Sequence, residues 1–167
     1  MNTITCMVFD VDGVLTDGGI SITDSGDEIK TFNSRDGHGI KLLMRAGIEV
    51  VILTGRTSRV VEHRSRELGI SHIIQGAKDK KGALMDFSER IGIKPANMAY
   101  MGDDVVDLPA MSLCGLTFAP ADAVDMVRQR VDIVTTLPGG HGAAREAIEA
   151  LLKRLGLLDQ VMERYGE

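Results

Sequence analysis

The chain has 167 residues, a formal net charge of −5 and a hydrophobic fraction of 44%. Because domains usually span about 100–200 residues, we expect residues 1–167 to form a single domain. The acidic balance argues against a nucleic-acid partner, which normally requires a basic stripe. No apolar stretch approaches the roughly 20 residues of a membrane span, so the sequence also argues against a membrane partner.

Cys6 and Cys114 are the only cysteines, and both lie in apolar stretches without the spacing of metal ligands. We interpret them as reduced, buried thiols. The first apolar run begins close to Met1, which leaves no room for a signal peptide. These features predict a cytoplasmic protein.

Short apolar runs typical of buried strands alternate with patterns typical of helices. We expect strands at Thr5–Phe9, Glu49–Leu53, His72–Gln75, Met98–Met101, Leu116–Phe118 and Asp132–Val134. We expect helices at Gly39–Ala46, Ser58–Leu68, Lys80–Ile91, Val106–Leu113, Ala121–Arg130 and Gly142–Leu155. This alternation predicts an α/β fold, a doubly wound (Rossmann-like) parallel sheet with helices on both faces.

The stretch Gly19–Phe32 interrupts the alternation. Two short strands, Ile20–Thr23 and Glu28–Phe32, flank the turn-forming residues Asp24–Asp27. The period-two pattern around turn residues predicts a β-hairpin. This flap, about residues 18–33, follows the first strand directly, so we expect it to project over the carboxyl edge of the sheet.

The segment after the first strand carries the strongest chemical signal. Its apolar run ends in Asp10 and Asp12, whose side chains leave the strand on the same side. Two carboxylates this close repel one another unless a cation lies between them. The pair therefore predicts a Mg²⁺ site that holds an aspartate able to attack a phosphate.

Polar groups also follow the next strands along the chain. Thr54 follows the second strand, Lys80 begins a helix after the third, and Asp103 follows the fourth. Ligands bind beyond the carboxyl ends of the strands in open parallel sheets. We therefore expect these groups to meet Asp10 and Asp12 at one edge.

This set of side chains suits phosphoryl transfer, in which positioning and electrostatic stabilisation dominate. Asp10 and Asp103 can supply oxygen ligands to Mg²⁺, which would let Asp10 act as the nucleophile. Asp12 could protonate the leaving alkoxide and later accept a proton from water. Thr54 and Lys80 would hold the transferring oxygens.

The ordered motifs resemble those of the haloacid dehalogenase superfamily of phosphatases. The resemblance rests on Asp10-Val11-Asp12-Gly13, Thr54, Lys80 and Gly102-Asp103-Asp104. It implies an aspartyl-phosphate intermediate on Asp10, and Asp12 as an acid/base whose backbone carbonyl is a further metal ligand. It also implies Asp103 as a metal ligand, with Asp104 or Asp107 supporting the metal site.

Within the superfamily, the chain is similar to the capless branch that acts on 3-deoxy-D-manno-octulosonate 8-phosphate, because the hairpin stands in place of a cap domain. The matching stretches are Phe32–Gly37, Thr54–Arg56, Arg64 with Glu67–Ile70, and Pro138–Glu146. The branch implies a role in lipopolysaccharide precursor synthesis and a homotetramer in which a neighbouring subunit covers the active site. The substrate contacts that it implies are Asp12, Asn33, Ser34, Arg35, Asp36, Gly37, Lys41, Arg56, Arg64 and Lys80.

Arg56 and Arg64 suit the carboxylate of such a sugar acid, since guanidinium groups pair well with carboxylates. The alternative substrate is the 9-phosphate of a nine-carbon, sialic-type acid. Related phosphatases for those acids have an acidic residue where this chain has Arg56, so Arg56 favours the eight-carbon substrate. Lys41 stands where the family has an arginine, which keeps the charge but loses the two-pronged geometry.

A phospho-acceptor domain of the receiver type is the alternative from another functional class, because it also combines an acidic Mg²⁺ site with a phosphorylated Asp, a Thr and a Lys. We favour the enzyme because the expected nucleophile follows the first strand and because Asp12 suits an acid/base. A phosphotransferase or mutase, which shares the first half-reaction, stays open. A weakly catalytic partner of a sugar-nucleotide enzyme is a further alternative that the intact Asp10 and Asp12 argue against.

Two segments near the C-terminus each have two interpretations. Gly139–Gly142 is either the loop before the last helix or a mobile loop that shapes the site in an oligomer. The tail, about residues 156–167, is either a fraying helix end or a segment that docks beside a neighbour's active site.

Overall fold

A computed structural model describes residues 3–166 of the chain. Its main sheet is parallel, with the strand order β5-β4-β1-β6-β7-β8. The strands are β1 (Cys6–Phe9), β4 (Glu49–Leu53), β5 (His72–Ile74), β6 (Met98–Met101), β7 (Leu116–Ala119) and β8 (Ile133–Val134). The order is that of a doubly wound sheet and confirms the predicted fold class.

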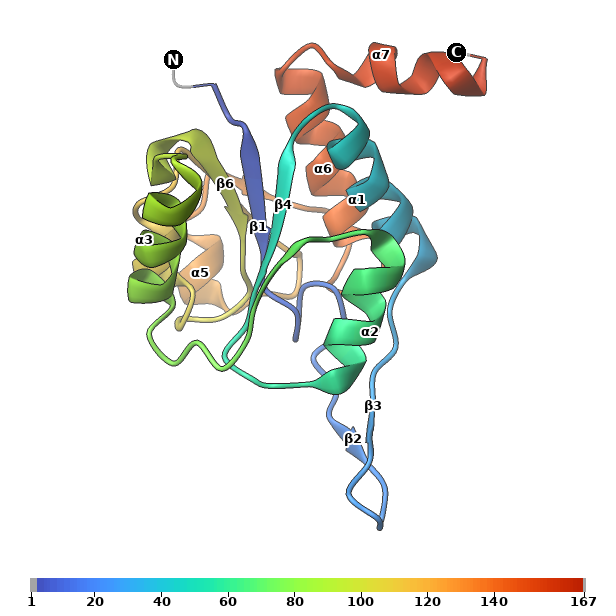
Figure 1. The fold of residues 1–167 in the computed structure, drawn as a ribbon, viewed down its shortest axis with the longest axis vertical. Coiled ribbons are helices and arrows are strands. Elements are labelled where there is room, and N and C mark those ends of the chain that lie inside the picture. Colours follow the sequence, from blue (N-terminus) through green and yellow to red (C-terminus); the bar gives the residue numbers. More distant parts are fainter. Residues whose placement is uncertain (1–2, 167) are drawn as a thin grey trace.

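Helices cover both faces of the sheet (Figure 1). One face carries α1 (Ser34–Arg45), α2 (Arg59–Leu68) and α6 (Ala143–Arg154), and the other carries α3 (Lys80–Ile91), α4 (Leu108–Met111) and α5 (Asp125–Arg128). Side chains of β1 alternate between the two layers: Met7 and Phe9 pack in the first core, whereas Cys6 and Val8 pack in the second. Burial on both faces explains why the strand sequences are apolar throughout.

Helix α1 begins at Ser34, five residues before the predicted start at Gly39. Asn33 caps it, because its side chain accepts the backbone N–H of Arg35 at 2.8 Å. Glycines in the first turns weaken the helical signal of the sequence. Helix α6 packs closely against one of them, since a Cβ on Gly39 would lie 3.0 Å from the Cδ of Arg145.

Helices α4 and α5 are shorter than predicted. The segment before α4 forms a turn instead, because the Asp107 carboxylate accepts the backbone N–H groups of Asp103 and Asp104 at 3.2 and 3.4 Å. The turn holds the chain that leaves β6 against the end of the sheet. Of the residues predicted to be helical, Val106 and Asp107 belong instead to the functional edge described below.

The predicted hairpin is present, with β2 (Ser21–Ile22) paired antiparallel to β3 (Glu28–Ile29). Its strands are shorter than predicted. Figure 1 shows the hairpin projecting beyond the edge at which β1 and β4 end. The two free thiols of the described residues are the buried Cys6 and the half-buried Cys114.

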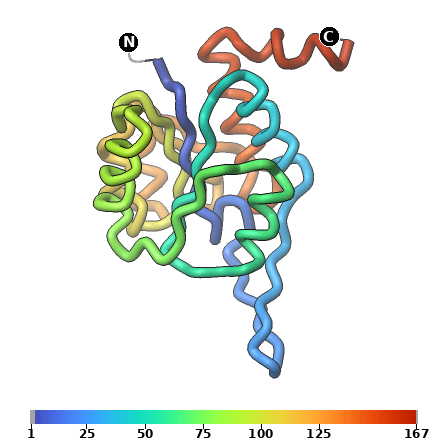
Figure 2. Tube along the Cα trace, viewed as in Figure 1, coloured from blue at the N-terminus to red at the C-terminus, as the bar shows by residue number. Residues whose placement is uncertain are grey.

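The tail is formed by α7 (Leu158–Met162) and the 3₁₀ helix η2 (Glu163–Tyr165). It lies at the end of the molecule opposite the hairpin (Figure 2). Val161 packs in the core beside α6, and the guanidinium of Arg45 donates a hydrogen bond of 2.5 Å to the Tyr165 hydroxyl. The tail is thus remote from the functional edge of its own chain. Within residues 3–166, no helix has the length and apolar character needed to cross a bilayer.

Candidate active site

The carboxyl ends of β1, β4 and β6 and the start of α3 meet at a pocket of about 410 Å³. Its lining residues are Asp10, Asp12, Gly18, Thr54, Gly55, Arg56, Ala77, Lys78, Lys80, Asp103, Asp104 and Val106. The structure therefore brings together the aspartates, the threonine and the lysine that the sequence places after separate strands. The parallel order of the strands explains this convergence.

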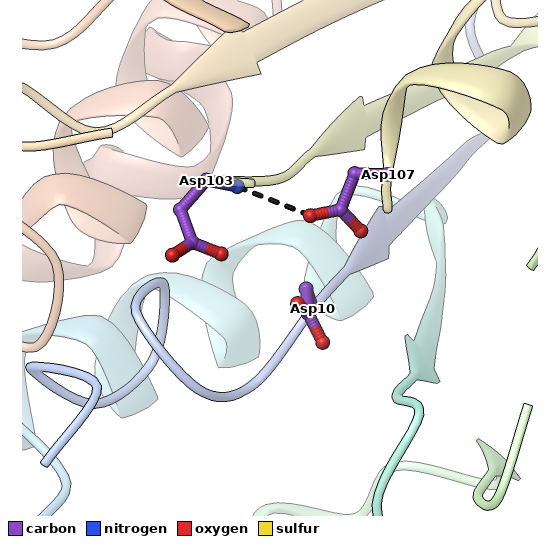
Figure 3. A group of neighbouring side chains, drawn as sticks. All are labelled: Asp10, Asp103 and Asp107. Atoms are coloured by element: carbon purple, nitrogen blue, oxygen red, sulfur yellow. Dashed lines mark hydrogen bonds between the residues drawn. The ribbon is translucent and has the colours of Figure 1, made fainter. Parts of the chain in front are cut away.

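Three carboxylates form a cluster at the edge of the pocket. Asp10 lies at the end of β1, and Asp103 and Asp107 come from the turn after β6 (Figure 3). One oxygen of each lies within 4.8 Å of one oxygen of the others. Of the two residues proposed from the sequence to support the metal, the structure places Asp107 in this cluster, whereas the Asp104 carboxylate accepts the N–H of Val105.

Burial and mutual repulsion disfavour the ionised form of the carboxyl groups in the cluster. Burial raises the pKa of Asp10 to about 6, and repulsion from Asp107 adds to the effect, although Lys80 opposes it. Burial also raises the pKa of Asp103 to about 7, with further repulsion from Asp10 and Asp107. A divalent cation would relieve both costs, and an all-carboxylate set of oxygen donors suits a hard ion such as Mg²⁺.

Lys80 is the cationic side chain that contacts the carboxylate cluster directly. The Asp79 side chain caps α3 by accepting the N–H of Gly82 at 3.0 Å, which places Lys80 in the first turn. Its ammonium lies 2.8 Å from Asp10 Oδ2 and 2.6 Å from Asp107 Oδ1. Burial would lower the pKa of Lys80, but the two carboxylates outweigh burial and raise it. Lys80 therefore stays charged beside the cluster.

Tyr100 is a member of this network that sequence reasoning missed. It is fully buried in β6, and its hydroxyl donates to Asp107 Oδ1 at 2.8 Å. Burial raises the pKa of the hydroxyl well above its ordinary value, so it acts as a neutral donor. The sequence did carry one sign of this role, because Tyr100 places a hydroxyl inside the otherwise apolar strand Met98–Met101.

Close backbone packing supports the loop that follows β1. Gly13 has a φ of +85°, and a Cβ built there would lie 2.0 Å from Asp103 Oδ2. A Cβ on Gly139 would lie 1.9 Å from the Gly13 carbonyl oxygen, and the N–H of Gly140 donates to the Val14 carbonyl at 3.0 Å. Gly139 and Gly140 thus pack directly against the loop that carries Asp12.

The Asp12 side chain lies outside the carboxylate cluster and points to the hairpin instead. Its Oδ1 contacts the ammonium of Lys30, and its Oδ2 lies 3.8 Å from Arg56 Nε. Lys30 was not among the residues predicted from the sequence. In the strand predicted at Glu28–Phe32, a lysine looks like an ordinary surface residue until the hairpin is folded over the site. In the structure Lys30 directly follows β3.

Most of the substrate contacts implied by the family resemblance lie outside the pocket of their own chain. Asn33, Asp36, Gly37 and Arg64 instead line a small separate cavity, of about 10 Å³, between α1 and α2. Asp36 is buried, and its Oδ1 accepts the N–H of Arg145 at 2.8 Å, which joins α1 to α6. Ser34, Arg35 and Lys41 also belong to α1 and line no part of the Asp10 pocket.

Thr54 is buried at the end of β4 and lines the pocket, as the sequence predicts. Arg56 lies at the rim, with 43% of its side chain exposed. Lys78 also lines the pocket and adds a second cationic side chain on the approach to the cluster. The pocket thus combines a buried acidic floor with a basic rim.

The chain is similar to known proteins over most of its length. Residues 26–115 match the family of haloacid dehalogenase-like hydrolases. A 3-deoxy-D-manno-octulosonate 8-phosphate phosphatase, KdsC, from Escherichia coli K12 is 46% identical over 157 residues, which cover 94% of this chain and 84% of the relative.

Solved structures show the same likeness. The 3-deoxy-D-manno-octulosonate 8-phosphate phosphatase from Moraxella catarrhalis, solved with a magnesium ion, a phosphate ion and a KDO molecule, superposes with a TM-score of 0.95 at 40% identity, covering 98% of this chain and 94% of that one. The cobalt-bound phosphatase from Haemophilus influenzae superposes with a TM-score of 0.90 at 43% identity, covering 94% and 92%. The chain therefore belongs to the haloacid dehalogenase-like hydrolases, in the family of the 3-deoxy-D-manno-octulosonate 8-phosphate phosphatases.

Proposed function

We propose that this protein is a Mg²⁺-dependent phosphatase that hydrolyses 3-deoxy-D-manno-octulosonate 8-phosphate to the free sugar acid and phosphate. The observation that carries the proposal is the cluster of Asp10, Asp103 and Asp107 beside Lys80, at the edge of one pocket. The family supplies the substrate class. In this proposal Asp10, Asp103 and the Asp12 backbone carbonyl would hold Mg²⁺, which would neutralise negative charge on the phosphoryl group. Asp107, whose oxygens accept from Lys80, Tyr100 and the backbone N–H groups of the turn, would support the metal site.

The chain's own residues would carry out two displacements. The Asp10 carboxylate attacks phosphorus, the bond between phosphorus and the sugar oxygen breaks, and Asp12 donates a proton to that oxygen. Water then attacks the aspartyl phosphate while Asp12 takes up its proton, which restores Asp10 and releases phosphate. Lys80 and Thr54, which both line the pocket, would hold the transferring oxygens through both steps.

The basic rim supports a substrate that carries a carboxylate besides its phosphate. Arg56 can present its guanidinium to that carboxylate, and Lys78 adds charge beside it. Arg56 also favours the eight-carbon acid over the nine-carbon alternative, because it replaces the acidic residue of the nine-carbon relatives. Phosphate esters without a carboxylate should then bind less tightly.

We further propose a cytoplasmic homotetramer that serves lipopolysaccharide precursor synthesis. The hairpin exposes the apolar side chains of Ile20, Ile22 and Ile29, which are 55–63% accessible in the single chain and suit a subunit interface. Of the substrate contacts implied by the family, Asn33, Ser34, Arg35, Lys41 and Arg64 do not line their own pocket. They would reach substrate only from a neighbouring subunit, or through a rearrangement. Light scattering on the purified protein measures the subunit number.

A panel of phosphate esters tests the activity. Phosphate release is measured with Mg²⁺ and with a chelator, using eight- and nine-carbon sugar-acid phosphates and simple sugar phosphates. We expect many turnovers per chain, a preference for the eight-carbon acid, and loss of activity with the chelator. Asp10→Asn should lower turnover by at least roughly 10³-fold, whereas Asp86→Asn, at an exposed position on α3, should not change it.

Two results would contradict the proposal. One stable phosphoryl group per chain without release would indicate a receiver-type domain. Near-full activity of the Asp10→Asn variant would remove the nucleophile from the mechanism.

A further inference from the structure

Lys30 is a buried cation at the base of the hairpin. Only 1% of its side chain is exposed, although the hairpin beyond it projects into solvent (Figure 1). Its ammonium contacts Asp12 Oδ1 and lies 3.2 Å from Glu28 Oε1. Because an unpaired buried charge is costly, the two carboxylates fix the position of the ammonium, and the ammonium in turn fixes theirs.

Glu28 connects Lys30 to the body of the molecule. Its Oε2 accepts a hydrogen bond from the Ser58 hydroxyl, and Arg56 Nη2 lies 3.1 Å from its Oε1. The hydrogen bond from Ser58 is the largest of the effects that lower the pKa of Glu28, and those from Lys30 and Arg56 add to it. Glu28 is therefore a charged anchor between the hairpin and α2.

Ser58 is itself held at the N-terminus of α2. It caps the helix, and its backbone N–H donates to the Gln75 side chain at 2.7 Å. A chain of polar contacts thus runs from a fixed helix terminus through Glu28 and Lys30 to Asp12. The hairpin is fastened to the site by charged side chains at its base.

The Asp12 carboxylate depends on this arrangement for its orientation. Within residues 3–166, the hydrogen bond from Lys30 is the only one that it accepts, since Arg56 Nε at 3.8 Å is too far to donate. Its exposure of 21% leaves it room to turn. We propose that Lys30 is a positioning residue that aims the Asp12 carboxylate at the leaving-group oxygen, which makes the hairpin part of the catalytic machinery of its own chain. The inference rests on the proposed function.

The experiment uses the dependence of rate on the leaving group. Proton donation by Asp12 matters for an alkyl ester, whose alkoxide leaves poorly, and matters little for 4-nitrophenyl phosphate, whose phenolate leaves readily. The ratio kcat/KM includes steps only up to departure of the leaving group, so it isolates this proton transfer from the later hydrolysis of the aspartyl phosphate. Wild type and Lys30→Met are compared on both esters.

We expect Lys30→Met to lower kcat/KM for the alkyl ester by at least roughly 30-fold, part of the ~10²–10⁴-fold that a positioned acid supplies, and for 4-nitrophenyl phosphate by less than about 3-fold. Asp12→Asn should show the same selectivity with a larger loss. Lys30→Arg, which keeps the charge, should recover most of the alkyl-ester activity, and Glu28→Gln should give an intermediate loss. Lys153→Met, an exposed lysine of α6, is the matched control and should resemble wild type.

Equal losses on the two esters would overturn the proposal, because a residue that serves the phosphate or the fold affects both alike. A crystal structure of Lys30→Met provides a readout that does not require activity. We expect the Asp12 carboxylate to be displaced while the backbone of residues 10–12 is unchanged, and an undisplaced carboxylate would also overturn the proposal. If wild type hydrolyses none of the esters, the proposed function fails by itself and the position of Asp12 still decides the role of Lys30.

Discussion

The ammonium of Lys80 lies 2.8 Å from the carboxylate of Asp10, and both side chains are more than nine-tenths buried. The two residues are 70 positions apart in the sequence and meet because β1 and α3 open onto the same edge of the sheet. The contact holds the proposed nucleophile in place and offsets part of its charge. The same ammonium also lies 2.6 Å from Oδ1 of Asp107, whose side chain is completely buried.

Replacing Lys80 by Met should damage both activity and stability. The variant leaves Asp10 and Asp107 facing each other without their cation, and breaking a buried ion pair in this way costs roughly 3–5 kcal/mol. Turnover should fall by at least about 10²-fold, as when an electrostatic contact to the transition state is removed. Denaturant unfolding and steady-state kinetics measure the two effects. Lys81→Met, at the exposed neighbouring position, is the control, and an equal loss there would contradict the assignment.

Gly13→Ala should lower the affinity for Mg²⁺ and should cost only a modest part of the folding stability. A Cβ at Gly13 would lie 2.0 Å from Asp103 Oδ2, so the Asp103 carboxylate must leave the cluster. Gly69→Ala is the matched control, because Gly69 has a similar φ of +84° but nothing within 4 Å of the added carbon. Both variants should lose roughly 1–2 kcal/mol of stability from left-handed backbone strain.

Only Gly13→Ala should lose Mg²⁺ affinity, by at least about 10-fold if one carboxylate ligand is withdrawn. Calorimetric titration with Mg²⁺ measures the difference between the two variants. Equal affinity in both would show that Asp103 can move aside without leaving the ion.

The stability of the metal-free protein should fall as pH rises through the titration of the cluster. Folding raises the pKa of Asp10 from 3.8 to about 6 and that of Asp103 from 3.8 to about 7. The folded state therefore binds more protons than the unfolded state in this range. The stabilisation from the protonated carboxyls is complete below about pH 4 and is lost as pH rises through about 6 to 7.

Mg²⁺ should reverse this trend, because it binds the ionised carboxylates. Thermal unfolding at a fixed Mg²⁺ concentration should show a larger increase of Tm at about pH 8 than at about pH 5. Asp103→Asn should reduce both the loss of stability with pH and the response to Mg²⁺. A Mg²⁺-induced shift of Tm that does not change with pH would contradict the proposed ligands.

Asp36→Ala should lower stability rather than substrate affinity. The Asp36 carboxylate accepts the N–H of Arg145, and its Oδ2 has no hydrogen-bond partner among residues 3–166. Burial raises the pKa of this carboxyl. Removing the acceptor should cost about 1–3 kcal/mol, measured by denaturant unfolding, while KM stays unchanged. A raised KM at unchanged stability would instead support the substrate contact that the family resemblance implies.

The site was predictable where chemistry follows directly from strand position. Asp10, Thr54 and Asp103 each come just after an apolar run, and parallel strands must bring such residues to one edge. Lys80 was predictable for a similar reason, since it opens a helix after another strand. The fold class, the hairpin and most strand bounds followed from the same periodicity, because burial on both faces imposes apolar strands.

The tertiary structure decided what depends on how separate elements dock. The sequence alone did not choose between Asp104 and Asp107, which differ in whether the turn after β6 points the side chain inward. It placed the start of α1 too late, because glycines in the first turns, among them the Gly39 that packs against α6, lower helix propensity. It also left Lys30 among surface residues, since only the folded hairpin brings that ammonium across 18 positions to Asp12. Patterns along a chain record which face of an element is buried, whereas the partner of a polar side chain is set by the packing of one element against another.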